Sequence, residues 1–408
     1  MTTKNQAKTK FVLLVGDGMA DYGLPELGGK TPLEVSRTPN MDRVAACRVG
    51  LVKTIPDDME PGSDVANLSL LGYDPGIYHN GRAPFEAASM GVSLGDDEVA
   101  FRMNLVTLDR RSDIEIVMIS HSSGDISTKE GWQIVEGLKG QLTIPAIRIY
   151  PGVAYRHLLV WGGGPLENET IPPHDVLDQN MASYLNRHAQ DAITGLIRQS
   201  WGYLERHPVN LARNEKGLEM ANSIWLWGQG KAPNLPLFGD KFGLQGGIIS
   251  AVDLLKGIGA CAGMEPIEVE GATGYLDTNY LGKAEGALKS LERLDFVFVH
   301  VEAPDEASHN GNIEEKIQAI EAFDEKVVGT VLKGMAAFGD YRIMIASDHL
   351  TPISKKTHVN DATPFAWGSR KELSRKIKGP EFSEQFAKKS GLAFQKGYEL
   401  MPAFLDTP

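Results

Sequence analysis

The sequence predicts an α/β fold: a mostly parallel β-sheet with helices on both faces, and an α+β module inserted into it. Two observations predict the sheet. Short runs rich in Val, Ile and Phe, typical of strands buried on both faces, lie at residues 11–15, 296–301 and 342–346. Strands and helices also alternate along residues 11–75 and 248–350. This alternation is typical of parallel sheets.

The middle of the chain has a different pattern, which predicts the inserted α+β module. Its expected elements are a hairpin of Phe101–Leu108 and Ile114–Ile119, a helix at Ile126–Leu138, and a strand pair at Ile144–Tyr150 and Arg156–Trp161. Loop-like stretches with Pro and Gly near Tyr78 and Gly239 are typical of domain boundaries. We therefore expect residues 1–78 and 239–408 to form one discontinuous domain and residues 79–238 to form the insert.

Composition narrows the classes of function. The chain has 408 residues and a net charge of -12, which argues against nucleic-acid and anionic-membrane partners. The polar N-terminus is followed by an apolar run too short for a signal peptide or membrane span. Cys47 and Cys261 lack metal-ligand partners at short spacing, and two free thiols suit a reducing compartment. We expect a cytoplasmic protein; the sequence leaves its oligomeric state open.

Acidic and histidine side chains follow the three predicted buried strands. They are Asp17, Asp305 with His309 four residues later, and Asp348-His349 with His358 nine residues later. In open α/β sheets, ligands bind outside the carboxyl ends of the strands. Carboxylates and imidazoles are common ligands of divalent metals. One such Asp could be a helix cap, but three in the same context favour a metal site.

Ser63 is the candidate nucleophile. It follows Pro61-Gly62, and apolar residues then repeat at helical spacing through Leu71. This pattern places Ser63 at a helix N-terminus, where backbone N–H groups favour anions. A plain N-cap serine is the alternative, and the sequence leaves both interpretations open. A metal beside the hydroxyl would make it a usable alkoxide near neutral pH.

Four segments occur in a characteristic order: GDGMADYGLPELGGKTPLEVSRTPNMD, GSDVANLSLLGYDP, HVEAPDEASHNGN and SDHLTPISKKTHV. Together they resemble the archaeal-type cofactor-independent phosphoglycerate mutases of the alkaline phosphatase superfamily. Further similar segments extend the resemblance over nearly the whole chain. It implies an alkaline-phosphatase-like fold with a cap domain. It also implies interconversion of 3-phosphoglycerate and 2-phosphoglycerate, a step of glycolysis and gluconeogenesis, through a phosphoserine and without 2,3-bisphosphoglycerate.

The resemblance implies two divalent metals, manganese first, with zinc or magnesium as alternatives. By position, the ligands of one metal would be Asp17, Ser63, Asp348 and His349, and those of the other Asp305, His309 and His358. Ser63 matches the residue that becomes phosphoserine. Lys256 looks like the family's lysine near the phosphate, although the residues alone equally indicate a solvated helix lysine.

The inserted module would match the cap that binds glycerate, so a small phosphorylated acid is the expected partner. Arg156, His157 and Arg213 are the candidate substrate contacts. A guanidinium suits carboxylate and phosphate, with an ordinary surface arginine as the alternative at each position. Other functions also stay open: a metal-dependent phosphatase, a homoserine-kinase-like phosphotransferase, for which a nucleotide signature is missing, or a non-catalytic sugar-phosphate binder.

Overall fold

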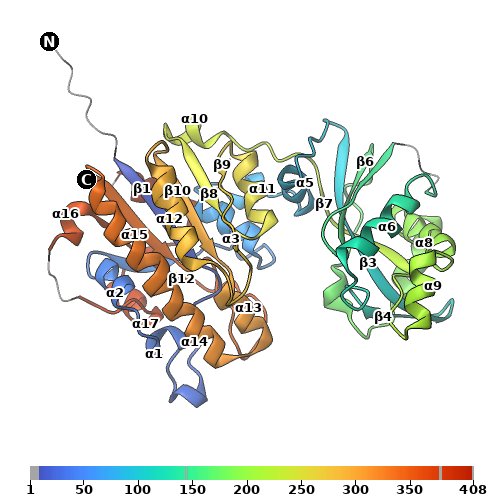
Figure 1. Cartoon of the computed structure of the whole chain (residues 1–408), viewed down its shortest axis with the longest axis horizontal. Helices are drawn as coiled ribbons and strands as arrows, with labels where there is room; N and C mark the ends of the chain where they lie inside the picture. The colour runs from blue at the N-terminus through green and yellow to red at the C-terminus, as the bar shows by residue number, and fades with distance from the viewer. Residues whose placement is uncertain (1–8, 143, 145, 376–378, 407–408) are drawn as a thin grey trace, which may run out of the picture. The chain divides into compact units, whose positions relative to one another are not determined.

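The computed structural model describes residues 9–142, 144, 146–375 and 379–406. The chain divides into two compact units, shown in Figure 1. The first consists of Met1–His79 and Asn234–Pro408, and the second of Asn80–Pro233. The chain therefore crosses between them after His79 and after Pro233, where we had expected crossings near Tyr78 and Gly239. No helix of the described residues is long and apolar enough to span a membrane.

An eight-stranded sheet forms the centre of the first unit, in the order β13-β2-β12-β11-β1-β10-β8-β9. Its strands are β1 (Lys10–Gly16), β2 (Val49–Val52), β8 (Gly246–Ile249), β9 (Glu265–Pro266), β10 (Phe296–Val301), β11 (Tyr341–Ala346), β12 (Thr363–Ser369) and β13 (Ala393–Phe394). Strand β12 runs antiparallel to both neighbours, and every other pair is parallel. The predicted mostly parallel sheet is confirmed.

The three predicted buried strands lie side by side as β11, β1 and β10. Val15 of β1 pairs with His300 of β10 and with Ala346 of β11. The residues that follow these strands therefore leave the sheet at one edge. A backbone hydrogen bond of 2.9 Å from the N–H of Asp17 to the carbonyl of Val301 continues the pairing beyond the strand end. This register brings together side chains that lie about 300 residues apart in the sequence.

Helices cover both faces of this sheet, as the apolar composition of its strands requires. Val12 and Val297 point to one face, where they pack with residues of α2, α12, α14 and α15. On the other face Phe11 contacts Phe404 of α18, and Phe296 contacts Phe238 of α10. The helices are α1 (Pro32–Val35), α2 (Pro39–Ala45), α3 (Ser63–Leu70), α4 (Pro75–Tyr78), α10 (Phe238–Phe242), α11 (Asp253–Cys261), α12 (Tyr280–Leu291), α13 (Ala303–Asn310), α14 (Ile313–Ala322), α15 (Gly329–Gly334), α16 (Arg370–Leu373), α17 (Glu384–Ser390) and α18 (Leu400–Asp406).

The long helix expected across residues 312–335 contains a π-helical turn, Phe323–Val328, between α14 and α15. The buried Asp324 lies in this turn and accepts hydrogen bonds from the backbone N–H groups of Asn40 and Met41. These are orphan donors at the start of α2. A side chain from one helix thus caps another, a long-range contact that helical periodicity could not predict.

The second unit has a five-stranded antiparallel sheet in the order β4-β3-β6-β5, with β7 paired to β3. Its elements are β3 (Glu98–Ser112), β4 (Glu115–Ser120), β5 (Ile147–Tyr150), β6 (Arg156–Gly162), β7 (Ser223–Gly230), α5 (Ala83–Ser89), α6 (Thr128–Leu138), α7 (Ala182–Leu185), α8 (Ala192–Leu204) and α9 (Pro208–Glu215). The predicted hairpin and strand pair are present, although residues 143 and 145 lie outside the described part. Ser127 caps α6 in a capping box with Glu130.

Candidate metal centre

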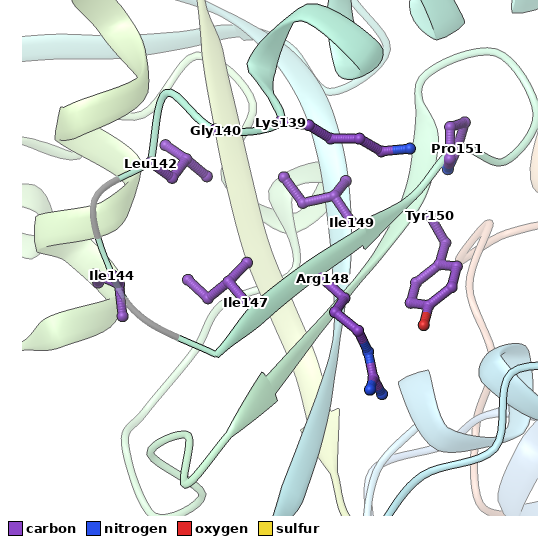
Figure 2. A pocket seen from close by; sticks show the side chains of 9 residues that line it. All are labelled: Lys139, Gly140, Leu142, Ile144, Ile147, Arg148, Ile149, Tyr150 and Pro151. Carbon is purple, nitrogen blue, oxygen red and sulfur yellow. The ribbon is translucent and has the colours of Figure 1, made fainter.

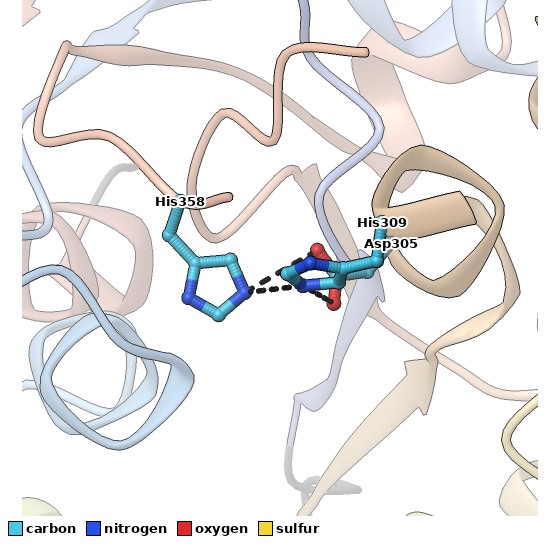
Figure 3. Close-up of side chains that lie close together, drawn as sticks. All are labelled: Asp305, His309 and His358. Atoms are coloured by element: carbon cyan, nitrogen blue, oxygen red, sulfur yellow. Dashed lines mark hydrogen bonds and ion pairs between the residues drawn. The ribbon is translucent and has the colours of Figure 1, made fainter. Parts of the chain in front are cut away.

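Asp305, His309 and His358 form a compact triangle of ligand atoms, shown in Figure 3. The Nε2 atom of His309 lies 3.1 Å from Oδ2 of Asp305 and 3.0 Å from Nε2 of His358. The Nε2 atom of His358 lies 3.5 Å from Oδ1 of Asp305. Ligand atoms around one tetrahedral zinc-like ion are ~3.3 Å apart. The triangle therefore has the size of a metal-ligand set.

The orientation of His309 is set by its other ring nitrogen. Its Nδ1 lies 2.9 Å from the carbonyl oxygen of Lys356, so Nδ1 carries the hydrogen and donates it. A neutral His309 then presents its Nε2 lone pair toward Asp305 and His358. A backbone carbonyl behind the imidazole is a common support for histidine ligands.

A second set of ligand atoms surrounds Nε2 of His349. This atom lies 3.2 Å from Oδ1 of Asp17 and 3.5 Å from Oδ2 of Asp348. It also lies 3.1 Å from the hydroxyl oxygen of Ser63. Ser63 is the first residue of α3, and Gly62 occupies the N-cap position without a side-chain hydrogen bond. The Ser63 hydroxyl therefore faces the cluster and does not cap the helix.

Thr351 connects the two sets. Its hydroxyl donates to Oδ1 of Asp305 at 2.5 Å, so it accepts from Nδ1 of His349 at 3.1 Å. This arrangement leaves the lone pair of His349 on Nε2, toward Asp17 and Ser63. One ligand atom each of Asp17, Asp305 and His349 lies within 4.8 Å of the others. The six predicted Asp and His residues and Ser63 therefore converge at one edge of the sheet.

Neighbouring donors fix the carboxylate of Asp348. Its Oδ1 accepts from the backbone N–H groups of Gly18, at 3.1 Å, and His349, at 2.9 Å. Its Oδ2 accepts from the amide of Asn67 at 2.8 Å. Asn67 also donates to the carbonyl of Ser63, so it ties the start of α3 to the end of β11. Asn67 was not predicted from the sequence.

The cluster concentrates negative charge in a buried place. Burial raises the pKa of Asp17 well above its usual value, and the carboxylates of Asp348 and Asp305 raise it further. Burial acts on Asp305 in the same direction, but hydrogen bonds from His309 and His358 lower its pKa well below the usual range. Oδ1 of Asp17 is buried and has no hydrogen-bond partner among the described residues. A bound cation would offset both the repulsion and this unpaired oxygen, so the residues fit a metal site.

His300, near the end of β10, belongs to this cluster and was missed by the sequence analysis. It is fully buried, and its Nε2 lies 3.0 Å from Oδ2 of Asp17. Burial lowers its pKa to about 3, so the imidazole is neutral. A histidine close to the end of an otherwise apolar strand was the available signal.

A buried lysine joins two of the loops that carry the candidate ligands. Lys316 of α14 is fully buried, and its ammonium group donates to Oδ2 of Asp21 at 2.8 Å. It also donates to the carbonyls of Thr351, at 3.0 Å, and Ala20, at 3.4 Å. These bonds hold the loop after β1 against the loop after β11. Burial lowers the pKa of Lys316, and the Asp21 carboxylate opposes that shift.

Lys256, the predicted lysine near the phosphate, lies in α11. Its ammonium group donates to both carboxylate oxygens of Glu268 at 2.9 Å. Its side chain is 20% exposed and that of Glu268 is 75% exposed. Lys256 therefore forms an accessible ion pair with Glu268. Such a pair contributes little free energy, so another anion can readily replace the Glu268 carboxylate.

In the second unit, Arg156 begins a continuous row of cationic and aromatic side chains. The guanidinium carbon of Arg156 lies 5.4 Å from the ring centre of Tyr155. Ring contacts then join Tyr155 to His121, His121 to His174, and His174 to Trp227. The row ends at Arg102, 4.2 Å from the ring centre of Trp227. Among its members, only Arg156 was a predicted substrate contact. We call this set the Arg156–Trp227 row.

A separate hollow of about 460 Å³ lies beside the edge strand β5, and Figure 2 shows the side chains that line it. They are mainly aliphatic, with Lys139 and Arg148 as the charged members. None of its nine lining residues is a serine, cysteine, histidine or carboxylate, so it lacks the chemistry of the strand-end cluster.

Sequence comparison connects this geometry to known proteins. Residues 45–210 match the family model described as 2,3-bisphosphoglycerate-independent phosphoglycerate mutase. A probable 2,3-bisphosphoglycerate-independent phosphoglycerate mutase of Geobacter sulfurreducens is 49% identical over 97% of this chain and 100% of its own length. A mutase of the same name from Methanosarcina acetivorans is 51% identical over 88% of this chain and 90% of its own. The chain belongs to the 2,3-bisphosphoglycerate-independent phosphoglycerate mutase family.

Solved structures agree with this assignment at the level of the fold. A protein from Pyrococcus horikoshii superposes with a TM-score of 0.78 at 28% identity, covering 98% of this chain and 97% of its own. A cofactor-independent phosphoglycerate mutase from Thermoplasma acidophilum superposes with a TM-score of 0.61 at 24% identity, covering 97% and 99%.

Two of the substrate contacts expected from the mutase family lie in buried positions. Arg213 lies in α9 and is 5% exposed. It donates to the carboxylate of Glu130 and to the carbonyls of Glu219 and Ser123. His157 is buried in β6, where Nδ1 accepts from the N–H of Gly152. Burial lowers the pKa of His157 to about 3. Both side chains thus already have partners within the second unit, and their contact with substrate stays a prediction.

Gly18 provides a test of the cluster geometry. Its φ is +57°, and a Cβ there would lie 2.5 Å from Oδ1 of Asp305 and 2.6 Å from the hydroxyl of Thr351. We expect Gly18→Ala to displace the Asp305 carboxylate and to lower the affinity for Mn²⁺ at least tenfold, measured by calorimetry. Gly28→Ala is the control: its φ is +68°, yet no atom lies within 4 Å of the added Cβ. Equal affinities in the two variants would contradict the tight packing around Asp305.

Arg213 and Arg156 provide a test of how much each side chain contributes to the stability of the fold. Arg213→Met removes three bonds from a buried guanidinium, so it should lower the free energy of unfolding by about 3 kcal/mol. Arg156→Met removes an exposed side chain and should change that energy by less than about 0.5 kcal/mol. Denaturant unfolding of both variants measures the difference. A stable Arg213→Met protein would restore a role for Arg213 outside the fold.

Proposed function

We propose that this protein interconverts 3-phosphoglycerate and 2-phosphoglycerate without 2,3-bisphosphoglycerate, with Ser63 as the phosphoryl carrier. The observation that supports it best is the position of the Ser63 hydroxyl. It lies 3.1 Å from Nε2 of His349, within a cluster of carboxylates and imidazoles. A serine that only capped its helix would point to backbone N–H groups, and Ser63 does not.

The same cluster would hold two divalent cations. Asp17, Ser63, Asp348 and His349 would bind one, and Asp305, His309 and His358 the other. Mixed carboxylate and imidazole ligands suit manganese or zinc better than magnesium, and manganese is our first choice. Such ions would lower the pKa of the Ser63 hydroxyl and polarise the phosphoryl oxygens.

The side chains of the chain then have defined tasks. Oγ of Ser63 attacks the phosphorus of 3-phosphoglycerate, an Oγ–P bond forms, and the bond from phosphorus to the 3-oxygen breaks. Backbone N–H groups at the start of α3 would face phosphoryl oxygens bound near Ser63. Lys256 would exchange Glu268 for a phosphate oxygen. The 2-hydroxyl of the same glycerate next attacks the phosphoserine, which releases Ser63 and forms 2-phosphoglycerate.

Glycerate must stay bound between these two steps, and we propose Arg156 as a side chain that holds it. Arg156 is exposed and can pair with the substrate carboxylate. Arg102 is less available for substrate, because its guanidinium already pairs with the carboxylate of Glu86 at 2.9 Å. Exclusion of water matters here, because water competes for the phosphoserine.

Two other functions use the same cluster. A phosphatase would let water attack the phosphoserine, and a homoserine-kinase-like enzyme would transfer phosphate to homoserine and need ATP. An enolase-coupled assay with 3-phosphoglycerate, Mn²⁺ and no added 2,3-bisphosphoglycerate separates them. The mutase yields 2-phosphoglycerate, whereas the phosphatase yields inorganic phosphate. Phosphate release alone would contradict the proposed function.

Ser63→Ala tests the phosphoryl carrier. We expect it to abolish both turnover and ³²P labelling of the protein, because no hydroxyl remains to attack. The matched control is Ser369→Ala, which removes a true N-cap serine of α16 that accepts from Glu372. It should cost about 1 kcal/mol of stability and leave the activity intact. Turnover by metal-replete Ser63→Ala protein would exclude Ser63 as the carrier.

Metal binding should release a proton at neutral pH. Burial would lower the pKa of His309, but its hydrogen bond to Asp305 raises that pKa to about 9 in the metal-free protein. The imidazole is therefore protonated below about pH 9, and a cation must displace this proton. We expect Mn²⁺ affinity to rise roughly tenfold per pH unit between about pH 6 and 8 at this site. Calorimetry in buffers of different ionisation enthalpy should show that about one proton is released for each ion bound at this site. Release of no proton would contradict the pairing of protonated His309 with Asp305.

A further inference from the structure

His300 is the member of the strand-end cluster that the proposed function leaves without a task. It is fully buried in β10 and pairs in register with Val15, two residues before Asp17. Its Nε2 lies 3.0 Å from Oδ2 of Asp17, and this buried atom has no hydrogen-bond partner within the described ranges. An unpaired buried N–H is costly, so the carboxylate of Asp17 is the natural acceptor for it.

The other ring nitrogen of His300 indicates which tautomer is present. Nδ1 lies 3.4 Å from the hydroxyl oxygen of Ser250. That oxygen already accepts from the N–H of Val252 at 3.0 Å, so its own hydrogen is available for Nδ1. A ring that accepts at Nδ1 carries its hydrogen on Nε2. That hydrogen is then on the ring nitrogen that lies 3.0 Å from Oδ2 of Asp17.

The two oxygens of Asp17 have different surroundings. Oδ2 faces His300, on the side of the sheet. Oδ1 faces Nε2 of His349, on the side of the cluster, and has no hydrogen-bond partner in the part of the chain described. A donor that occupies Oδ2 leaves Oδ1 as the oxygen for a cation. Strand β10 is also anchored at this point, because the ammonium group of the buried Lys283 donates a hydrogen bond of 3.0 Å to the backbone carbonyl of His300.

We propose that His300 is a positioning residue that holds Oδ2 of Asp17, so that Oδ1 is presented toward His349 as a metal ligand. This inference rests on the proposed metal centre and adds a residue that supports one of its ligands. A histidine that donates to a ligating carboxylate fixes the rotation of that carboxylate. Removing such a supporting partner typically weakens metal binding ten- to a hundredfold.

The test compares His300→Leu, which removes the donor, with His300→Gln, which retains an N–H. Manganese affinity and stoichiometry are measured by calorimetry on metal-free protein without substrate. We expect His300→Leu to weaken one of two Mn²⁺ sites by about ten- to a hundredfold. His300→Gln should stay within about threefold of the unsubstituted protein. At saturating Mn²⁺, His300→Leu should still bind two ions, with the KM for 3-phosphoglycerate unchanged.

Phe298→Leu is the matched control, because Phe298 is also fully buried in β10 and its ring lies parallel to that of His300. It should leave both affinities unchanged. Ser250→Ala removes the partner of Nδ1 and should weaken the same site as His300→Leu by a smaller factor. This variant keeps the test decisive if His300→Leu fails to fold.

Three results would overturn the assignment. Unchanged affinity in folded His300→Leu would leave His300 without a role toward Asp17. Loss of one ion even at saturating Mn²⁺ would make His300 a direct ligand. An equal loss in Phe298→Leu would reduce the effect to strand packing. Failure of the proposed function is separate: two tight Mn²⁺ sites in a protein without mutase activity would leave the role of His300 intact.

Discussion

The close approach of three buried carboxylates is the constraint around which the first unit is built. Asp17, Asp305 and Asp348 are each at most 5% exposed. Burying an ionised carboxylate costs several kcal/mol unless hydrogen bonds or opposite charges compensate. Asp348 receives three N–H donors, and Asp305 receives the Thr351 hydroxyl and two imidazoles. Oδ1 of Asp17 has no hydrogen-bond partner among the residues that the structure describes, and the pKa of Asp17 is raised well above the usual value. The uncompensated charge therefore collects where a cation would lie.

The parallel sheet makes this concentration of charge possible. Strands β11, β1 and β10 are adjacent and share one direction, so three distant segments deliver their polar residues to one edge. The strands are apolar on both faces and packed under helices, which fixes the positions of the residues that follow them. The two ligand sets still differ in access to solvent. His349 is fully buried, whereas the side chains of His309 and His358 are 35% and 20% exposed.

The sequence was sufficient to predict the parallel sheet and the convergence of its strand-end ligands, because both depend on local patterns. Apolar runs show where strands end, and their shared direction brings the ends together. It was insufficient for residues whose role depends on a distant partner. His300 is concealed in an apolar strand, and Lys316 resembles a surface lysine in an amphipathic helix until Asp21, 295 residues away, is found beside it.

Arg213 also shows that the sequence does not reveal distant partners, here for a residue that was predicted to bind substrate. Its neighbourhood, HPVNLARNEKG, is polar, but Pro208 at the start of α9 begins a helix. An arginine in a polar segment can bind a ligand or stabilise the fold. Arg213 bonds to Ser123 and Glu130, 90 and 83 residues away, which no local pattern could indicate. Local chemistry indicates which atoms a side chain offers, and only the tertiary contacts show whether they are already used.

The balance between mutase and phosphatase depends on a small free-energy difference. In the proposed function, phosphoryl transfer to Ser63 takes place at the strand-end cluster, and either water or glycerate could attack the resulting phosphoserine. One charge-assisted hydrogen bond to glycerate is worth roughly 1.5–3 kcal/mol. That energy changes its retention about ten- to a hundredfold. A few such contacts would therefore be enough to favour return of the phosphate to glycerate over its loss to water. The side chains that hold glycerate thus determine which of the two acceptors receives the phosphate.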